Sequence, residues 1–272
     1  MIIILVILII LYLYLICPKL SRRKAMKPYE KKFLAHRGLF NNLDVPENSL
    51  PAFKKAVAND FGIELDVQLT TDDQLVVFHD ASLKRMTGID KDLTSCSYEE
   101  LQSYSLLETD EKIPLFKDVL ACLKPDTPLV IEIKSEGDYI ATTKKAVEMT
   151  RDYQGLFNME SFNPMVIRYL RMHEPQVIRG QLAYSFLSDK ESKIPWLLKF
   201  ALSNLLLNAF TRPDYVAFDC KGYENFSFRI VSKLLKGECV AWTVRSDEVF
   251  KKIKPYYNCF IFDSYLPDNA DL

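Results

Sequence analysis

The chain has 272 residues, of which 49% are apolar and 26% charged, and its formal net charge is −1. This balance is typical of a globular protein with enough apolar residues for a core, and it excludes a largely disordered chain. A net charge so close to zero gives no general attraction to nucleic acid, so we expect no nucleic-acid partner, and nothing predicts a protein partner.

Residues 1–17, MIIILVILIILYLYLIC, are apolar and uncharged. As a helix they would be about 25 Å long, slightly less than the ~30 Å hydrocarbon core, and snorkelling of the following cations could cover the difference. A signal peptide usually has cations before its apolar run and small residues at its end, whereas here the cations follow and large residues precede Cys17. We predict an uncleaved transmembrane anchor over residues 1–18, with an unusual signal peptide as the alternative.

Residues 19–32 hold seven lysines or arginines and one glutamate. Because positive charge beside a transmembrane segment stays on the cytoplasmic side, we predict a basic juxtamembrane linker here and a single-pass membrane protein. The main domain, residues 33–272, would then be cytoplasmic. The six cysteines are scattered without a CxxC pair, which also favours a reducing compartment and disfavours a cysteine zinc site.

From residue 33 onward, short apolar runs alternate with longer helical patterns. We predict strands at residues 33–35, 62–67, 129–134, 156–162, 177–183, 215–219, 239–244 and 259–263. We predict helices between them, for example at residues 49–60, 139–153 and 226–237. Eight strands alternating with helices in a chain of this length predict an α/β fold, the (β/α)8 TIM barrel.

The run LVVFHD at residues 75–80 predicts a ninth strand outside this alternation. The preceding TTDD at 70–73 supplies turn residues, so we expect residues 66–79 to form a hairpin above the barrel mouth. The hairpin would return His79 to a position beside Asp66. Residues from about 81 to 114 would then form a short insertion after the second strand.

Three carboxylates occur in two of the predicted barrel strands. Glu64 and Asp66 are two residues apart and share a face of one strand, and Glu132 lies in the next barrel strand. Without a cation or basic partners, such clustered carboxylates would repel one another. Oxygen ligands without cysteine suit Mg²⁺ or Ca²⁺ better than zinc, so we predict a divalent-cation site at the rim where barrel active sites are built.

Two of the three histidines, His36 and His79, end predicted strands in the same region. A pair of histidines suits proton transfer near neutral pH. Arg37 and Lys134 add fixed positive charge, which suits a phosphate group. A divalent cation, two histidines and two cations together indicate phosphodiester cleavage.

The motifs that contain these residues are HRG (36–38), PEN (46–48), ELD (64–66), HD (79–80) and EIK (132–134). Together they resemble the glycerophosphodiester phosphodiesterase family over essentially the whole chain after residue 32. The resemblance implies that the metal ligands are Glu64, Asp66 and Glu132. It implies that His36 and His79 are the acid–base pair, and that Arg37 and Lys134 hold the phosphate. It further implies that Glu47 binds the metal or supports its ligands, and that Asn48 shapes the loop.

The activity that the resemblance implies is metal-dependent hydrolysis of glycerophosphodiesters to sn-glycerol 3-phosphate and an alcohol. One alternative is lysophospholipase D-type hydrolysis of lysophospholipids at the membrane. Another is an inactive barrel that binds lipid, which is disfavoured because no histidine or ligand is missing. The chain departs from the family pattern at Ser49, usually threonine, at Asp73, usually glycine, and at Arg245, usually asparagine.

Three further features remain open from the sequence. Phe162 and Trp242 end predicted strands, where they would line the substrate pocket or pack in the core. His173 falls late in a helical pattern before Pro175, and we expect it at the surface. Residues 194–210 are strongly apolar, and we expect a buried barrel helix, the alternative being a hydrophobic cover that touches a bilayer or an acyl chain.

Overall fold

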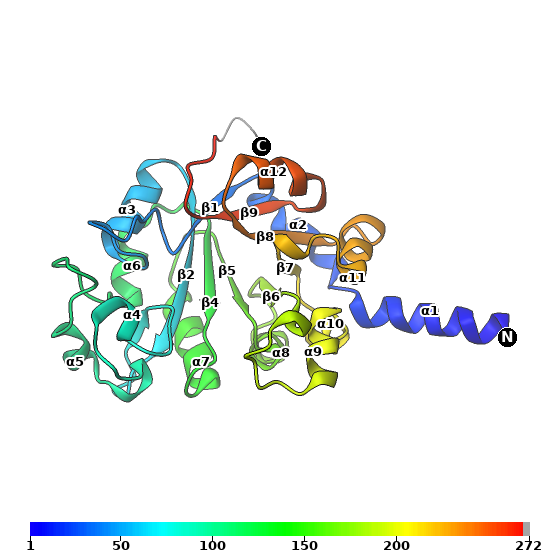
Figure 1. Cartoon of the computed structure of the whole chain (residues 1–272), viewed down its shortest axis with the longest axis horizontal. Helices are drawn as coiled ribbons and strands as arrows, with labels where there is room; N and C mark the ends of the chain where they lie inside the picture. Colours follow the sequence, from blue (N-terminus) through cyan, green and yellow to red (C-terminus); the bar gives the residue numbers. More distant parts are fainter. Residues whose placement is uncertain (269–272) are drawn as a thin grey trace. The chain divides into compact units, whose positions relative to one another are not determined.

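The structure is a computed structural model that describes residues 1–268 (Figure 1). Its strands are β1 Phe33–His36, β2 Gly62–Leu69, β3 Leu75–Val77, β4 Leu129–Ile133, β5 Phe157–Ser161, β6 Arg179–Ala183, β7 Tyr215–Asp219, β8 Glu238–Val244 and β9 Cys259–Phe262. Its α-helices are α1 Ile2–Ile16, α2 Arg23–Met26, α3 Leu50–Ala58, α4 Lys84–Thr87, α5 Tyr98–Gln102, α6 Phe116–Cys122, α7 Tyr139–Thr150, α8 Pro164–His173, α9 Trp196–Ser203, α10 Asn208–Thr211, α11 Phe226–Arg229 and α12 Asp247–Ile253.

The strands follow the hydrogen-bonded order β1-β9-β8-β7-β6-β5-β4-β2-β3, and β1 also pairs with β2. Without β3, the order of the described strands therefore closes on itself. The pairs β1–β2, β2–β4, β4–β5, β6–β7 and β7–β8 are parallel. This confirms the predicted (β/α)8 barrel, and the eight predicted barrel strands agree with the observed ones to within two residues at either end.

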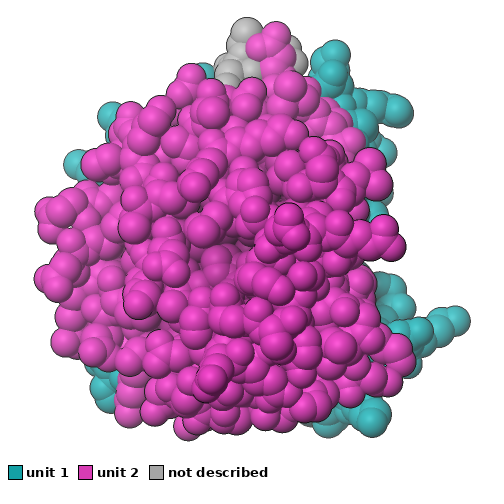
Figure 2. Space-filling model, turned by 90° about the vertical axis from the view of Figure 1, so that its left-hand side faces the viewer, with its two compact units in different colours: residues 1–31, 162–260 teal, residues 32–161, 261–272 magenta. Residues whose placement is uncertain are grey.

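The chain divides into two compact units, which are described separately. Unit 1 comprises residues 1–31 and 162–260, and unit 2 comprises residues 32–161 and the chain from Ile261 onward. The segments of unit 2, although far apart in the sequence, lie together in one body of atoms (Figure 2, magenta).

In unit 2, the predicted hairpin is present. Strand β3 runs antiparallel to β2, with Val77 opposite Val67, and Asp73 in the turn has the left-handed φ of 56° that aspartate tolerates. The amide of Phe78 donates to the carbonyl of Asp66 at 3.0 Å, so the chain returns beside Asp66 as expected. The strand itself ends at Val77, three residues earlier than predicted.

The insertion after β3 has a small core of its own. Its helices α4 and α5 bury apolar side chains against Val76 of β3 and against Phe78, which directly follows that strand. The members from the insertion are Leu83, Met86, Leu93, Cys96, Leu101, Leu106 and Ile113. Because this core fixes α4 to the hairpin, the insertion holds a rigid position within unit 2.

In unit 1, the basic segment is packed against the protein rather than forming a free linker. Short 3-10 turns at Leu20–Arg22 and Lys27–Tyr29 flank α2, and the side chains of Met26 and Tyr29 are buried. Arg22 forms an ion pair of 3.3 Å with the buried Asp214. The segment is therefore an integral part of this unit.

The helix at the N-terminus is shorter than predicted. Helix α1 has 15 residues and ends at Ile16, because Cys17 is extended before Pro18, and a residue before proline disfavours helical geometry. Among residues 1–268, no single helix combines the length and apolar composition needed to cross a membrane. One bent pair in this part of the chain, α1 followed by the helical segment Leu20–Tyr29 at an angle of 44°, reaches that length and composition. The prediction of one membrane-spanning helix over residues 1–18 is therefore not confirmed, because the helix observed there is too short.

The apolar stretch 194–210 is not one buried helix. It forms α9 and the start of α10, and α9 exposes 68% of Trp196 and 71% of Leu197. Only its C-terminal part, with Leu202 and the following Leu205, is buried. The expectation of a buried barrel helix was therefore wrong for the first half of the stretch. His173, at the end of α8, is exposed as predicted.

Candidate active site

Three buried carboxylates meet on neighbouring strands of unit 2. Glu64 and Asp66 lie on β2, and Asp66 is the direct Cα partner of Glu132 on β4. The two-residue period of a strand points all three to one face. One oxygen from each lies within 4.8 Å of the others, which is the separation that a single metal ion can bridge. The carboxylate group expected from the sequence is thus assembled.

The pKa values of Glu64 and Glu132 are raised, which indicates that the nearby cations do not fully neutralise the three carboxylates. Burial raises the pKa of Glu64 well above its usual range, and the charges of Asp66 and Glu132 raise it further. Burial also raises the pKa of Glu132, against the opposing effect of Lys134. For Asp66 burial acts in the same direction, but Lys134 and the other nearby cations outweigh it and lower the pKa.

The residues present fit a hard divalent cation. All three donors are carboxylate oxygens, which suit Mg²⁺ or Ca²⁺. The buried Oδ1 of Asp66 has no hydrogen-bond partner and lies 3.5 Å from Lys134 Nζ. A fourth buried acid, Glu160 on β5, is the Cα partner of Glu132. A bound cation would neutralise the repulsion within this group.

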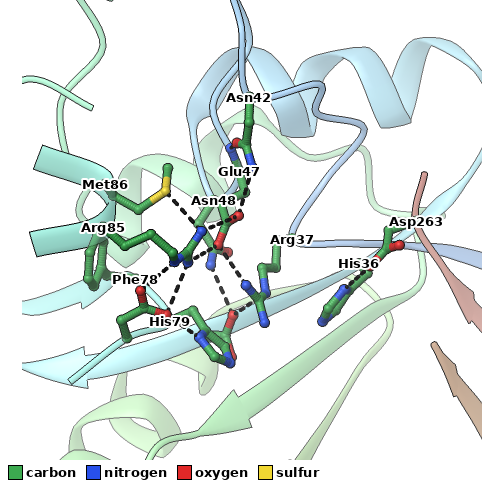
Figure 3. Close-up of polar contacts among 12 residues, drawn as sticks. His36, Arg37, Asn42, Glu47, Asn48, Phe78, His79, Arg85, Met86 and Asp263 are labelled. Atoms are coloured by element: carbon green, nitrogen blue, oxygen red, sulfur yellow. Dashed lines mark hydrogen bonds and ion pairs between the residues drawn. The ribbon is translucent and has the colours of Figure 1, made fainter. Parts of the chain in front are cut away.

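His36 ends β1 with its ring held by a carboxylate. Its Nδ1 lies 2.9 Å from Oδ2 of Asp263 (Figure 3). Its Nε2 lies 3.9 Å from Oε2 of Glu64. Because an ionised carboxylate only accepts hydrogen bonds, Nδ1 carries the proton and Nε2 is the basic nitrogen of the neutral ring. Burial lowers the pKa of His36 despite the hydrogen bond to Asp263, which favours this neutral form.

His79 is held in the same manner by its neighbour in the sequence. Its Nδ1 lies 2.6 Å from Oδ1 of Asp80, which leaves Nε2 as the nitrogen not engaged by the carboxylate. Asp80 is fixed in turn by Arg85 of α4, whose Nε donates to Oδ2 at 2.6 Å. Each histidine of the predicted pair therefore has a carboxylate that orients its ring.

The two predicted phosphate-binding cations lie among the acids. Arg37, at a left-handed φ of 55°, places Nη1 2.6 Å from Oε1 of Glu47 and Nε 3.5 Å from Oδ2 of Asp66. Lys134 Nζ lies 2.9 Å from Oε1 of Glu132. The carboxylates raise the pKa of Lys134 although burial opposes this. Both cations remain charged beside the carboxylate group, where an anion could also bind.

Glu47 and Asn48 brace the site from the loop before α3. Glu47 is not a member of the three-carboxylate group; it accepts from Arg37 and, at 2.7 and 3.0 Å, from the two terminal nitrogens of Arg85 (Figure 3). Asn48 Nδ2 donates to Oδ2 of Asp66 at 2.9 Å. Ser49 caps α3 by accepting from the amide of Ala52, which explains why serine replaces the usual threonine without loss of the cap.

The two predicted aromatic site residues belong to unit 1, where they lie together. The rings of Phe162 and Trp242 are edge to face at a centroid distance of 5.3 Å. Tyr184 and Phe186 contact the same Phe162 ring at 5.8 and 6.4 Å. Both Phe162 and Trp242 are partly exposed, so this aromatic cluster presents apolar surface.

Sequence reasoning did not assign a role to four site residues, Asp80, Arg85, Glu160 and Asp263. Asp80 and Asp263 are the last residues of predicted strands, and that position is the signal that could have identified them. Glu160 sits in a strand, where an alternation rule could place it beside Glu132. Arg85 carries no local signal, because its partner Glu47 is 38 residues away in the sequence.

Comparison with known proteins gives one consistent family. The model of the glycerophosphoryl diester phosphodiesterase family matches residues 36–264. Lysophospholipase D GDPD1 of Rattus norvegicus is 33% identical over 158 residues, which are 53% of this chain and only 48% of that protein. Glycerophosphodiester phosphodiesterase 1 of Mus musculus is 26% identical over 297 residues, covering 93% of this chain and 83% of that protein.

Solved structures agree on the fold. A phosphodiesterase of Oleispira antarctica, determined in complex with the product sn-glycerol-3-phosphate, aligns with a TM-score of 0.69 at 22% identity, covering 88% of this chain and 95% of that one. The matched region contains every motif on which the resemblance was based. The chain belongs to the glycerophosphoryl diester phosphodiesterase family.

Proposed function

We propose that this chain hydrolyses glycerophosphodiesters to sn-glycerol 3-phosphate and an alcohol, with Mg²⁺ or Ca²⁺ as cofactor. The observation that supports this most strongly is the group of three buried carboxylates in the same unit as two carboxylate-bound histidines. Family membership supports the same class of reaction. Glu64, Asp66 and Glu132 would hold the cation.

In the proposed mechanism, one histidine acts on the attacking group and the other on the leaving group during displacement at phosphorus. A bound cation would act as a Lewis acid on the phosphate oxygens. Arg37 and Lys134 would bind those oxygens and stabilise their growing charge. Nε2 of His36 would take the proton of the attacking hydroxyl as a new P–O bond forms. Nε2 of His79 would donate a proton to the alcohol oxygen as the old P–O bond breaks. The nucleophile is water or a neighbouring hydroxyl of the substrate.

Choline release from glycerophosphocholine by the full chain tests this function. We expect turnover with Mg²⁺ or Ca²⁺ and none with excess chelator, with recovery when the cation is restored. Hydrolysis that continues at the same rate in chelator would contradict the metal-dependent proposal. A folded, cation-loaded protein that releases no alcohol from any diester would instead support an inactive lipid-binding module.

A lysophospholipase D-type reaction is the second candidate. It is supported by the similarity to a lysophospholipase D and by the exposed apolar side chains of α9. Parallel measurements on glycerophosphocholine and on lysophosphatidylcholine distinguish the two. A kcat/KM at least tenfold higher for the lysolipid would favour this second candidate.

We further propose that α1 anchors the protein in a membrane, with the catalytic residues on the cytoplasmic side. Residues 2–11 of α1 are apolar and 48–77% exposed, and the cations of residues 19–32 follow them. Protease treatment of sealed, right-side-out membrane vesicles tests the orientation. Protection of the main domain supports it, and digestion from outside would contradict it.

A further inference from the structure

Helix α9 in unit 1 presents a continuous apolar face to the outside. The exposed fractions of Trp196, Leu197, Leu198 and Phe200 are 68, 71, 41 and 39%, and the rings of Trp196 and Phe200 stack at 5.7 Å. The C-terminal end of the helix is held in the unit, where Leu202 and Ser203 are buried and Ser203 Oγ accepts from the amide of Leu187 at 3.2 Å. Such large side chains on one face are unusual for a surface that contacts only water.

Exposed lysines accompany this face. Lys190 and Lys193 lie in the loop that leads into α9, and both are exposed, as is Glu191 between them. Trp, Phe and Leu on one side with lysines beside them are the composition of helices that lie in the interface of a bilayer, where the lysines meet anionic head groups.

The C-terminal part of α1, residues 12–16, is held by contacts with the rest of unit 1 and is called the root of α1 below. Tyr12 OH lies 2.8 Å from Ser227 Oγ, the Arg212 guanidinium lies 4.3 Å from the centre of the Tyr14 ring, and Asn208 Nδ2 donates to the carbonyl of Ile16 at 2.7 Å. These contacts tie residues 12–16 to α10 and α11. The direction in which the exposed residues 2–11 leave unit 1 is therefore set by the fold.

The apolar surface continues from this root towards α9. Phe226, 71% exposed, stacks on Tyr12 at 6.4 Å. Ser227, which binds Tyr12, also donates to Oδ1 of Asn204 at the end of α9. The eight-residue α9 thus begins about 12 Å from Asn204, which is linked to Tyr12 of α1 through Ser227.

We propose that α9 docks on the surface of the lipid bilayer, with Trp196, Leu197 and Phe200 in the interfacial layer of the leaflet that receives the root of α1. This inference rests on the membrane anchoring proposed above. The occupant is a lipid surface because the exposed apolar side chains of α9 lie in the same unit as the uncharged apolar helix α1, to which Asn204 and Ser227 link the end of α9. Two contacts, α1 and α9, fix the orientation of unit 1 on the membrane, where α1 alone would leave it free to tilt.

Fluorescence quenching of Trp196 tests the docking directly. In full-chain Trp242→Phe protein, Trp196 is the only tryptophan. The protein is reconstituted in phosphatidylcholine vesicles containing 30% phosphatidylglycerol and lipids brominated at a shallow or a deep acyl position. We expect a blue-shifted emission with stronger quenching by the shallow bromines. Emission typical of water and no quenching, in protein that floats with the vesicles, would overturn the inference.

A matched pair of variants measures the contribution of the face. Trp196→Ser/Leu197→Ser should lower hydrolysis of lysophosphatidylcholine presented in these vesicles at least fivefold and leave soluble glycerophosphocholine turnover unchanged. Met165→Ser/Met172→Ser, which removes two exposed apolar side chains from α8, should change neither rate. Equal loss for both substrates would contradict a membrane role of α9. Absence of soluble diester turnover in the unchanged protein would instead count against the proposed function, while quenching of Trp196 would still support docking.

Discussion

His36 and His79 differ from the third histidine, His173, in the contacts of their imidazole rings. His36 and His79 each donate through Nδ1 to a carboxylate, whereas His173 ends α8 with its ring against Tyr169 at 4.6 Å. An acceptor on Nδ1 fixes the tautomer and directs Nε2 to the proton that it transfers. The hydrogen bond from Nδ1 to a carboxylate therefore distinguishes the two candidate catalytic histidines from His173.

Replacing either histidine tests this assignment. We expect His36→Ala and His79→Ala each to lower kcat for glycerophosphocholine by about 10²–10⁴-fold, because proton transfer contributes that much. Circular dichroism should show unchanged folding. The control is His173→Ala, which should retain full activity because the side chain is exposed. Folded variants with near-full activity would remove the acid–base proposal.

Glu47 should make the stability of the protein depend on acid pH. Burial by itself would raise its pKa, but Arg85, Arg37 and Asn42 lower it to about 2, compared with about 4.3 in an unfolded chain. Its ionised form therefore stabilises the fold fully above about pH 5, and this contribution is lost as the pH falls towards 2.

The corresponding measurement is the urea midpoint of unfolding between pH 6 and pH 3. Glu47→Gln should be less stable than the unchanged protein at pH 6, and the difference should shrink as the pH falls. Glu108→Gln, at an exposed position, should show the pH dependence of the unchanged protein. A constant difference across this range would show that Glu47 is not held ionised by its arginines.

At the scale of elements, the insertion contributes to the site through α4. Arg85 joins Glu47, in the loop before α3, to Asp80, which orients His79. The small apolar core of residues 81–114 holds α4 in place for this contact. The insertion is thus a support of the active site and not a neutral surface loop.

Removing this cation should affect both stability and activity. We expect Arg85→Gln to destabilise the protein by about 1–3 kcal/mol, because the buried carboxylate of Glu47 loses two of its hydrogen bonds and keeps those from Arg37 and Asn42. Its kcat should fall at least about tenfold as His79 loses its fixed orientation. Lys84→Gln is the matched control, since Lys84 pairs with the exposed Asp90, and it should stay within about 0.5 kcal/mol. Equal effects of the two variants would contradict the role of α4.

The sequence predicted the elements whose pattern is local. Barrel strands carry runs of buried apolar residues, and the two-residue period aligned Glu64 with Asp66, so the carboxylate group followed from neighbouring strands. Arg85 was missed because its partner Glu47 lies 38 residues away in the chain. Such contacts depend on tertiary packing, which no local pattern encodes.

Two features of unit 1 were missed for related reasons. Apolar composition alone cannot distinguish a buried helix from one that presents Trp196 and Leu197 outward, because the face that packs is selected by the neighbours of the helix. Similarly, the many cations of residues 19–32 predicted a basic juxtamembrane linker and gave no sign of the buried side chains within it. The burial of Met26 and Tyr29 among them depends on a surface formed by distant parts of the chain.

At the scale of the whole molecule, the N-terminal region has a proposed role as anchor and a packing role in unit 1, which truncation can separate. Residues 2–11 are exposed, whereas Ile16, Met26 and Tyr29 are buried in unit 1. Deleting residues 2–11 should abolish vesicle binding and leave the thermal midpoint unchanged. Deleting residues 1–31 should also lower the midpoint, because about 1.5–3 kcal/mol is lost for each large buried side chain.

Differential scanning calorimetry of the two truncated proteins in one detergent makes this comparison. The unchanged chain in the same detergent is the reference. If the longer deletion is as stable as the shorter one, the packing of the basic segment contributes nothing to the fold. If the shorter deletion still floats with vesicles when it also carries Trp196→Ser/Leu197→Ser in α9, α1 is not the anchor.

The central claim is that Glu64, Asp66 and Glu132 together hold one divalent cation on which diester hydrolysis depends. The most direct measurement is anomalous diffraction from crystals of the active protein soaked in Mn²⁺, a hard cation that accepts the same oxygen ligands. The account predicts one strong peak within about 2.0–2.6 Å of an oxygen from each of the three carboxylates. An active protein whose cation lies elsewhere, with no peak among these three residues, would contradict it.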